Sequence, residues 1–121
     1  MSKINTGSLD FATVAELNSL LRERQISSED LTKYLLGRLS TIGPQYNALA
    51  ALEEKEAIDQ AKDVDDDLKR QRFRSMLQGI PYGAKDLLSV QGYPTTWGAK
   101  PFEKQMFDED AHVIRQLRHA G

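Results

Sequence analysis

The sequence predicts an α/β protein in which N-terminal helices come before the first strands of a sheet. Two helix-capping signals, each followed by apolar residues at helical spacing, place helices before residue 70. An apolar run punctuated by glycine and proline, residues 77–90, then indicates strands. We therefore expect a helical region over residues 1–74 and the start of an α/β core, incomplete in this chain, over residues 75–121.

The first two helices are predicted from the residues that cap them. Thr13 and Glu16 match the capping box, in which each side chain bonds the backbone N–H group of the other residue. Leucines at helical spacing follow, and we expect this helix to end near Gln25. Ser27, with two acidic residues close behind it, begins a second helix, which the Gly-Pro pair at 43–44 ends.

The next part of the chain combines a short apolar segment with an acidic helix. Residues 46–52 are predicted to form a strand, with the beginning of the next helix as the alternative. Residues 53–69 have apolar side chains at spacings of three and four, which predicts a helix. Its aspartates at 63, 65, 66 and 67 do not converge on one point, because adjacent helical residues diverge by about 100°. We therefore interpret them as a solvated helix end and expect no metal site.

Residues 77–86, LQGIPYGAKD, form the stretch that generic folding explains least well. Their apolar side chains predict a buried strand, with Gly79 and Pro81 at its entrance and Lys85 near its end. Lys85 is either a solvated strand end that pairs with a carboxylate or a buried amine with a chemical role. Because most lysines are solvated, the residues alone favour the first interpretation. Lys85 is nevertheless the candidate catalytic residue of this chain.

The remaining residues predict two short extended segments and a final helix. Residues 87–90 and 95–98 are expected to be extended, with a Gly-Tyr-Pro turn between them. Thr95, Thr96 and Trp97 are candidates for the border of a substrate channel, but such residues in a strand more often pack in a core. The acidic residues at 108–110 begin the final helix, and Gly121 is its expected C-cap.

Composition excludes several classes of function. The 121 residues are 40% hydrophobic and 28% charged, as in a soluble globular domain, and the net charge of -2 argues against direct binding of nucleic acid. The chain has no cysteine, so disulfides, thiolate nucleophiles and Cys-based zinc sites are excluded. No apolar run reaches the roughly 18 residues of a membrane span, and the first residues lack a secretory signal. We expect a cytoplasmic protein without a cofactor, a metal or a membrane partner.

The residues from Gly79 to Gly98 carry a resemblance to a known family. A Gly-Ile-Pro-x-x-x-Lys-Asp pattern begins at Gly79 and ends at Lys85 and Asp86, and GYPTTWG over residues 92–98 matches Gly-x-Pro-Thr-Thr-x-Gly. In these motifs the chain resembles the N-terminal part of an amidase signature enzyme. Residues 110–121 are similar to the helix that precedes that family's next strand, and the helices from Thr13 onward stand in the family's order. The resemblance thus covers nearly the whole chain.

The resemblance implies a mixed sheet and a Ser-cisSer-Lys triad that acts on a small-molecule amide. Lys85 would be the triad lysine, passing a proton through a bridging serine to the serine that attacks the amide carbonyl. A free lysine has a pKa of about 10.4, so a neutral amine at pH 7 requires a pKa lower by about three, or about 4 kcal/mol. Burial in an apolar strand acts in that direction.

The family places its two triad serines in a Gly/Ser-rich segment that this sequence does not contain. Ser27 and Ser28 are interpreted as helix caps, Ser75 as a linker residue and Ser89 as part of a strand. We expect one triad member here, so that activity requires the C-terminal portion of the fold or an oligomeric partner. The resemblance implies the N-terminal fragment of an amidase-type hydrolase or amidotransferase subunit; the alternative is a truncated, non-catalytic interaction module. The choice among a small amide, a peptide amide and a misacylated tRNA stays open.

Overall fold

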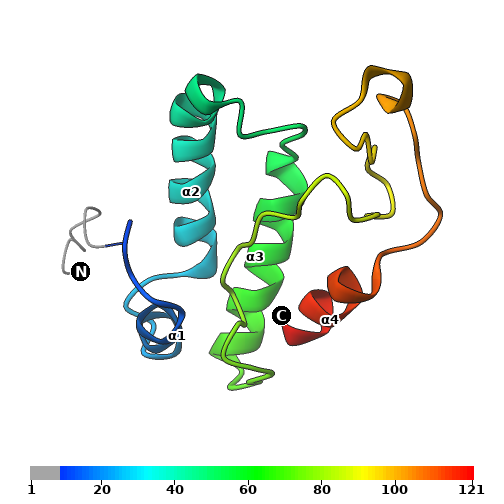
Figure 1. Ribbon diagram of the computed structural model, residues 1–121. Coiled ribbons are helices and arrows are strands. Elements are labelled where there is room, and N and C mark those ends of the chain that lie inside the picture. The colour runs from blue at the N-terminus through cyan, green and yellow to red at the C-terminus, as the bar shows by residue number, and fades with distance from the viewer. Residues whose placement is uncertain (1–8) are drawn as a thin grey trace.

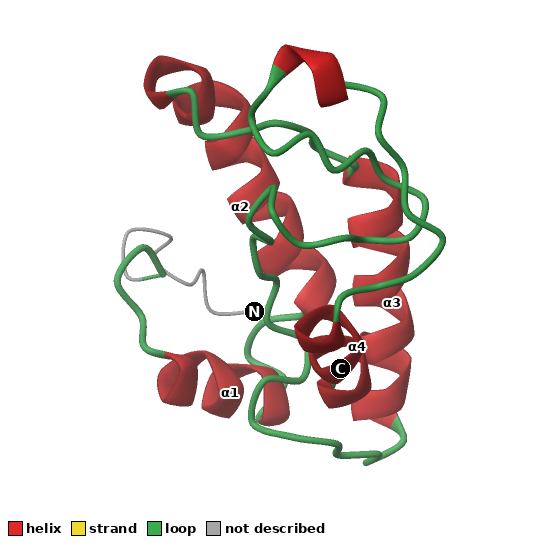
Figure 2. Cartoon of the chain, turned by 45° about the vertical axis from the view of Figure 1, so that its right-hand side comes forward, coloured by secondary structure: helices red, strands yellow, loops and turns green. Residues whose placement is uncertain are grey.

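A computed structural model describes residues 9–121, which form a helical structure (Figure 1). The α-helices are α1 (Val14–Arg22), α2 (Ser28–Ile42), α3 (Glu54–Lys69) and α4 (His112–Ala120), with short 3-10 helices at Gly43–Tyr46 and Lys100–Phe102. Helices α2 and α3 run side by side in opposite directions, α1 lies near the N-terminal end of α2, and α4 lies beside α3 (Figures 1 and 2).

The predicted helix starts are confirmed. The Thr13 hydroxyl accepts the Glu16 N–H at 3.2 Å, while the Glu16 carboxylate accepts the Thr13 N–H at 2.7 Å, which completes the capping box. Helix α1 ends at Arg22 and not at Gln25, because Arg24 takes a left-handed φ of 58°. The Ser27 hydroxyl caps α2 by accepting the Asp30 N–H at 3.0 Å.

The apolar core lies where α1, α2 and α3 meet. Its buried cluster consists of five leucines: Leu9, Leu17, Leu21, Leu31 and Leu68. Ile80 packs against this cluster from the stretch 77–86, so that stretch is attached to the helices at its beginning. The burial of apolar residues from each of the three helices explains why the local helix signals and the tertiary arrangement agree.

The predicted strands are not formed, and this part of the α/β prediction is wrong for the described residues. Among residues 9–121, β pairing is limited to an isolated antiparallel bridge between Pro94 and Met106. Residues 46–52 are neither a strand nor the start of α3, because the 3-10 helix is followed by Asn47 at a left-handed φ of 49° and α3 begins at Glu54. The division at residue 74 stays a prediction.

Residues 77–90 show the physical reason for the missing strands. The Leu77 carbonyl accepts the Ile80 N–H at 3.0 Å in a turn, and Gly79 has a φ of 82°. The chain then crosses in front of α3 without regular structure (Figure 1). A strand requires a neighbouring strand to bond its backbone N–H and C=O groups, and no described segment supplies one here.

Candidate functional site

Lys85 stands at the point where the extended segment turns. Its carbonyl oxygen accepts the N–H groups of Leu87 at 2.7 Å and Leu88 at 2.9 Å, which fixes a tight turn directly after the lysine. The side chain is exposed, and its amine forms no salt bridge or hydrogen bond with any of residues 9–121. The buried apolar strand expected around this lysine is therefore absent, which is a correction to its predicted environment.

Asp86 is bonded to the loop that carries the second motif. Its Oδ1 accepts the Thr96 N–H at 2.7 Å, and its Oδ2 accepts the Thr96 hydroxyl. These two bonds, the hydroxyl bond first, hold the pKa of the Asp86 carboxyl below its usual value. The two most specific parts of the resemblance, residues 79–86 and 92–98, thus contact each other through this carboxylate.

The loop that receives Asp86 is closed on itself. The Thr95 N–H donates to the Gln105 carbonyl oxygen at 2.8 Å, and the Gln105 amide returns a bond of 3.0 Å to the Thr95 carbonyl oxygen. Thr95 is 2% exposed, as expected for a packing role, whereas Trp97 is 47% exposed. The Trp97 ring stands edge-on to Phe102 with 5.0 Å between the ring centroids. Thr96 is therefore held on a structured loop.

The serines singled out from the sequence have structural contacts. The Ser28 hydroxyl donates to the Gly79 carbonyl oxygen at 2.8 Å, and the Ser75 hydroxyl donates to the Ala120 carbonyl oxygen at 2.8 Å. Within residues 9–121, no hydrogen bond joins a serine hydroxyl to the Lys85 amine. The described structure therefore presents Lys85 without a serine relay.

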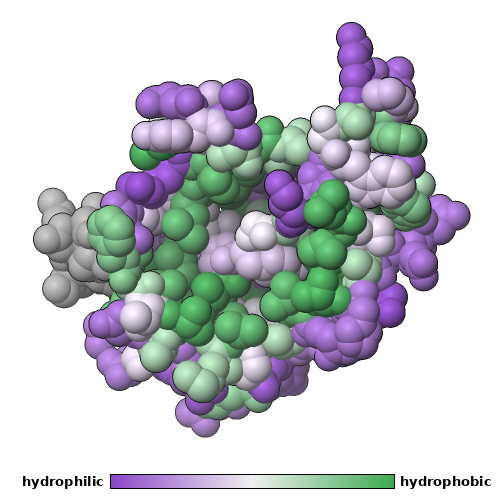
Figure 3. Space-filling view, in the orientation of Figure 1, coloured by the Kyte–Doolittle hydropathy of each residue, from purple (hydrophilic) through white to green (hydrophobic). Residues whose placement is uncertain are grey.

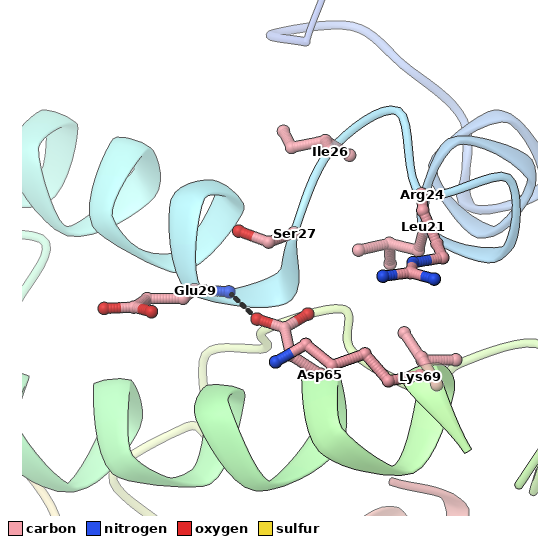
Figure 4. A pocket seen from close by; sticks show the side chains of 8 residues that line it. Leu21, Arg24, Ile26, Ser27, Glu29, Asp65 and Lys69 are labelled. Carbon is pink, nitrogen blue, oxygen red and sulfur yellow. Dashed lines mark hydrogen bonds between the residues drawn. The ribbon is translucent and has the colours of Figure 1, made fainter. Parts of the chain in front are cut away.

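Asp65 of α3 makes a structural contact that the sequence interpretation missed. Its Oδ1 accepts the Ser28 N–H at 2.7 Å and its Oδ2 accepts the Glu29 N–H at 3.0 Å, so it caps α2 across the helix pair (Figure 4). The interpretation as part of a solvated helix end is wrong for this residue. The available signal was its spacing from the buried Ala61 and Leu68, which places it on the inner face of α3.

A pocket of about 260 Å³ lies beside Asp65, between α1 and the facing ends of α2 and α3 (Figure 4). Its walls combine apolar and charged side chains, which come from Leu21, Arg24, Ile26, Ser27, Glu29, Asp65, Leu68 and Lys69. Lys85 does not line it. Over residues 9–121, no group of His, Asp and Glu side chains is arranged to hold a metal ion. In the same range, no helix is both long and apolar enough to span a bilayer.

Comparison with known proteins decides the family. A sequence profile described as Amidase matches residues 30–121, which include both motifs and Lys85. The chain belongs to the amidase signature family. Among curated members of the amidase family, a glutamyl-tRNA(Gln) amidotransferase subunit from Nitrosomonas eutropha is 34% identical over 110 residues. The protein of the same name from Coxiella burnetii is 38% identical over 109 residues.

The similarity to these amidase relatives covers the chain more completely than it covers them. The alignment includes 91% of this chain but 22% of the Nitrosomonas protein, and 90% of this chain but 22% of the Coxiella protein. The Clostridium botulinum protein of that name, 31% identical, is covered to the same 22%. The chain thus spans about a fifth of the length of the amidase relatives that it matches.

Proposed function

We propose that this chain is the N-terminal portion of an amidase-type hydrolase or amidotransferase subunit that cleaves a carboxamide C–N bond. The observation that carries the proposal is the family match over residues 30–121, which includes the Lys-Asp motif at Lys85 and Asp86. In this proposal Lys85 is the lysine of a Ser-cisSer-Lys triad, and the two serines belong to the remainder of the amidase fold. The substrate is a small molecule that carries the amide.

The proposed role of Lys85 is proton transfer. Its neutral amine accepts a proton from the bridging serine, which in turn takes the proton of the nucleophilic serine as that oxygen attacks the amide carbonyl. The proton then returns to the departing nitrogen as the C–N bond breaks. Water hydrolyses the resulting ester and regenerates the serine. A neutral amine requires removal from water, so the exposed Lys85 of this chain must be covered by other parts of the fold.

We propose that the cover is the C-terminal portion of the amidase fold or a partner subunit. Large apolar side chains near Lys85 in sequence, Tyr82, Leu87 and Trp97, are exposed in this structure and provide a surface for it. The relatives are named as subunits, which supports an oligomeric partner. A cytoplasmic location is part of the proposal, and fractionation of cells that express the tagged protein tests it.

Replacing Lys85 tests the catalytic part of the proposal. In the full-length protein, Lys85→Ala should lower kcat for carboxamide hydrolysis by about 10³-fold or more, because the proton relay loses its acceptor. Lys100→Ala, which removes another exposed lysine of the same region, is the matched control and should leave kcat unchanged. Circular dichroism of both variants checks the fold. Turnover by the Lys85 variant at the wild-type rate would remove this residue from the mechanism.

A serine-directed fluorophosphonate probe tests where the nucleophile lies. The probe should label the full-length protein at a serine outside residues 1–121 and should leave a polypeptide of residues 1–121 unlabelled, because the triad serines are not in this segment. Peptide mapping by mass spectrometry identifies the labelled residue. Stoichiometric labelling of the 1–121 polypeptide would contradict the proposed division of the triad.

The second candidate function is a non-catalytic interaction module derived from the amidase family. The observation that favours it is the exposed Lys85 amine, which has no hydrogen-bond or ion-pair partner in the described residues. The coding frame after Gly121 separates the two candidates. A frame that continues into a Gly/Ser-rich segment supports the enzyme, whereas a stop codon directly after Gly121 supports the module.

A further inference from the structure

The bonds of Asp86 use both of its carboxylate oxygens. One oxygen accepts the Thr96 N–H at 2.7 Å and the other accepts the Thr96 hydroxyl, so a single residue ten positions later holds the whole carboxylate. The same hydroxyl oxygen accepts the Gly98 N–H at 3.1 Å, which fixes its orientation. The arrangement is a small network in which each polar atom has a defined partner.

This network has a consequence for the lysine beside it. A lysine and an aspartate that are adjacent in an exposed turn have the charges to form an ion pair, but Lys85 and Asp86 form none. The Thr96 donors occupy the oxygens that the amine would otherwise bind. Residues 95–99 carry no charged side chain, so the loop itself brings no other charge toward the amine.

We propose that Asp86 is a positioning residue, which ties the turn after Lys85 to the 95–98 loop and keeps its own carboxylate away from the Lys85 amine. An amine that accepts a proton loses that ability when a carboxylate pairs with its charged form. Holding the carboxylate on neutral donors removes this competition while fixing the backbone at Lys85. This inference rests on the proposed function for its catalytic consequence, but not for its effect on the reactivity of the amine.

The test follows the Lys85 amine itself in the full-length protein. Competitive acetylation across a pH range, read by mass spectrometry at Lys85, gives the pH at which half of the amine is reactive, without any substrate. Thr96→Val keeps the β-branched shape and removes the hydroxyl, so one Asp86 oxygen is freed. We expect that midpoint to rise by about one pH unit. The kcat profile for amide hydrolysis should move upward by the same amount.

A second substitution separates positioning from simple loosening of the loop. Asp86→Asn in the Thr96→Val background removes the freed charge and should return the midpoint to that of Asp86→Asn alone. Thr96→Ser keeps the hydroxyl and should keep the wild-type midpoint. Where Thr96→Val does not fold, Thr96→Ala loses the same hydroxyl and carries the same expectation.

Two results would overturn the inference: an unchanged midpoint in the hydroxyl-deleted variant, or a raised midpoint that persists in the double variant. The proposed function fails on different evidence, namely undiminished amide hydrolysis by Lys85→Ala. The acetylation midpoint of Lys85 is measured independently of that result, so the two failures are distinguishable.

Discussion

Gly79 shows how one residue fixes the start of the Lys85 segment. Its φ is 82°, and a Cβ atom placed on it would lie 3.2 Å from the Val64 side chain and 3.3 Å from that of Leu21. Its N–H donates to the Gly121 carbonyl oxygen at 2.6 Å, and its own carbonyl oxygen accepts the Ser28 hydroxyl. Only a residue without a side chain satisfies the left-handed backbone and the close packing together.

Replacing this glycine should therefore destabilise the protein. Gly79→Ala is expected to lower the free energy of unfolding by about 1–3 kcal/mol, because the left-handed conformation and the crowding both disfavour a Cβ. Gly83→Ala is the matched control, since no atom lies within 4 Å of the added Cβ and its φ is not positive. Urea denaturation measures both variants. Equal stabilities would show that the chain relaxes around the new methyl group.

The residues of the candidate site divide into what local pattern predicts and what it does not. Lys85 stands out by its motif and Thr95 by its β-branched shape, and both conclusions depend on few neighbouring residues. The environment of Lys85 is not predictable in this way, because burial depends on segments distant in sequence. The bonds between Asp86 and Thr96 escape prediction for the same reason, since a carboxylate carries no local sign of the loop that it will bind.

Helix α2 is held at its start by another helix as well as by its own cap. Ser27 accepts the Asp30 N–H, while Asp65 of α3 accepts the N–H groups of Ser28 and Glu29. The first-turn N–H groups, which have no partner inside a helix, are thus divided between a local and a distant acceptor. A carboxylate at this end also interacts favourably with the positive end of the helix dipole.

Removing the distant acceptor should weaken this end of α2. Asp65→Ala is expected to reduce the free energy of unfolding by about 1–2 kcal/mol, as for the loss of a helix cap. Hydrogen exchange should quicken at the amides of Ser28 and Glu29. Asp63→Ala, on the exposed face of the same helix, removes the same charge and serves as the control. If both substitutions cost the same stability, the cap contributes nothing beyond net charge.

At the level of elements, helices were predictable and strands were not. The capping box at Thr13 and the Ser27 cap are encoded within four residues, so their helices begin where the sequence places them. The apolar run at 77–90 has the composition of strands, but a strand forms only against a partner. In residues 9–121 the run finds no such partner and stays irregular.

The molecule as a whole exposes more surface than its mass requires. Its accessible area is 8573 Å², whereas a compact monomer of 13.6 kDa exposes about 6,600 Å². Figure 3 shows apolar side chains bordering a hollow on one face. The exposed large apolar residues after α3 are spread over both motifs and the final helix, and include Phe73, Met76, Leu77, Tyr82, Leu87, Trp97, Phe102, Met106 and Val113. Such a surface is typical of a face that another polypeptide covers.

The backbone of residues 82–85 gives this surface a measurable property. None of the four N–H groups donates a hydrogen bond within residues 9–121, and the side chains of Tyr82 and Lys85 are exposed. A strand from the remainder of the amidase fold or from a partner would bond these groups, because an extended backbone edge is a template for pairing.

We therefore expect the amides of residues 82–85 to exchange slowly with deuterium in the full-length protein or its complex and rapidly in a polypeptide of residues 1–121. The amides in the middle of α3, already bonded within the helix, are the internal control and should be protected in both samples. The difference follows from pairing alone, since the sequence of the segment is the same in each. Rapid exchange at 82–85 in the full-length protein would mean that this edge stays open, and Lys85 would then lack the cover that a neutral amine requires.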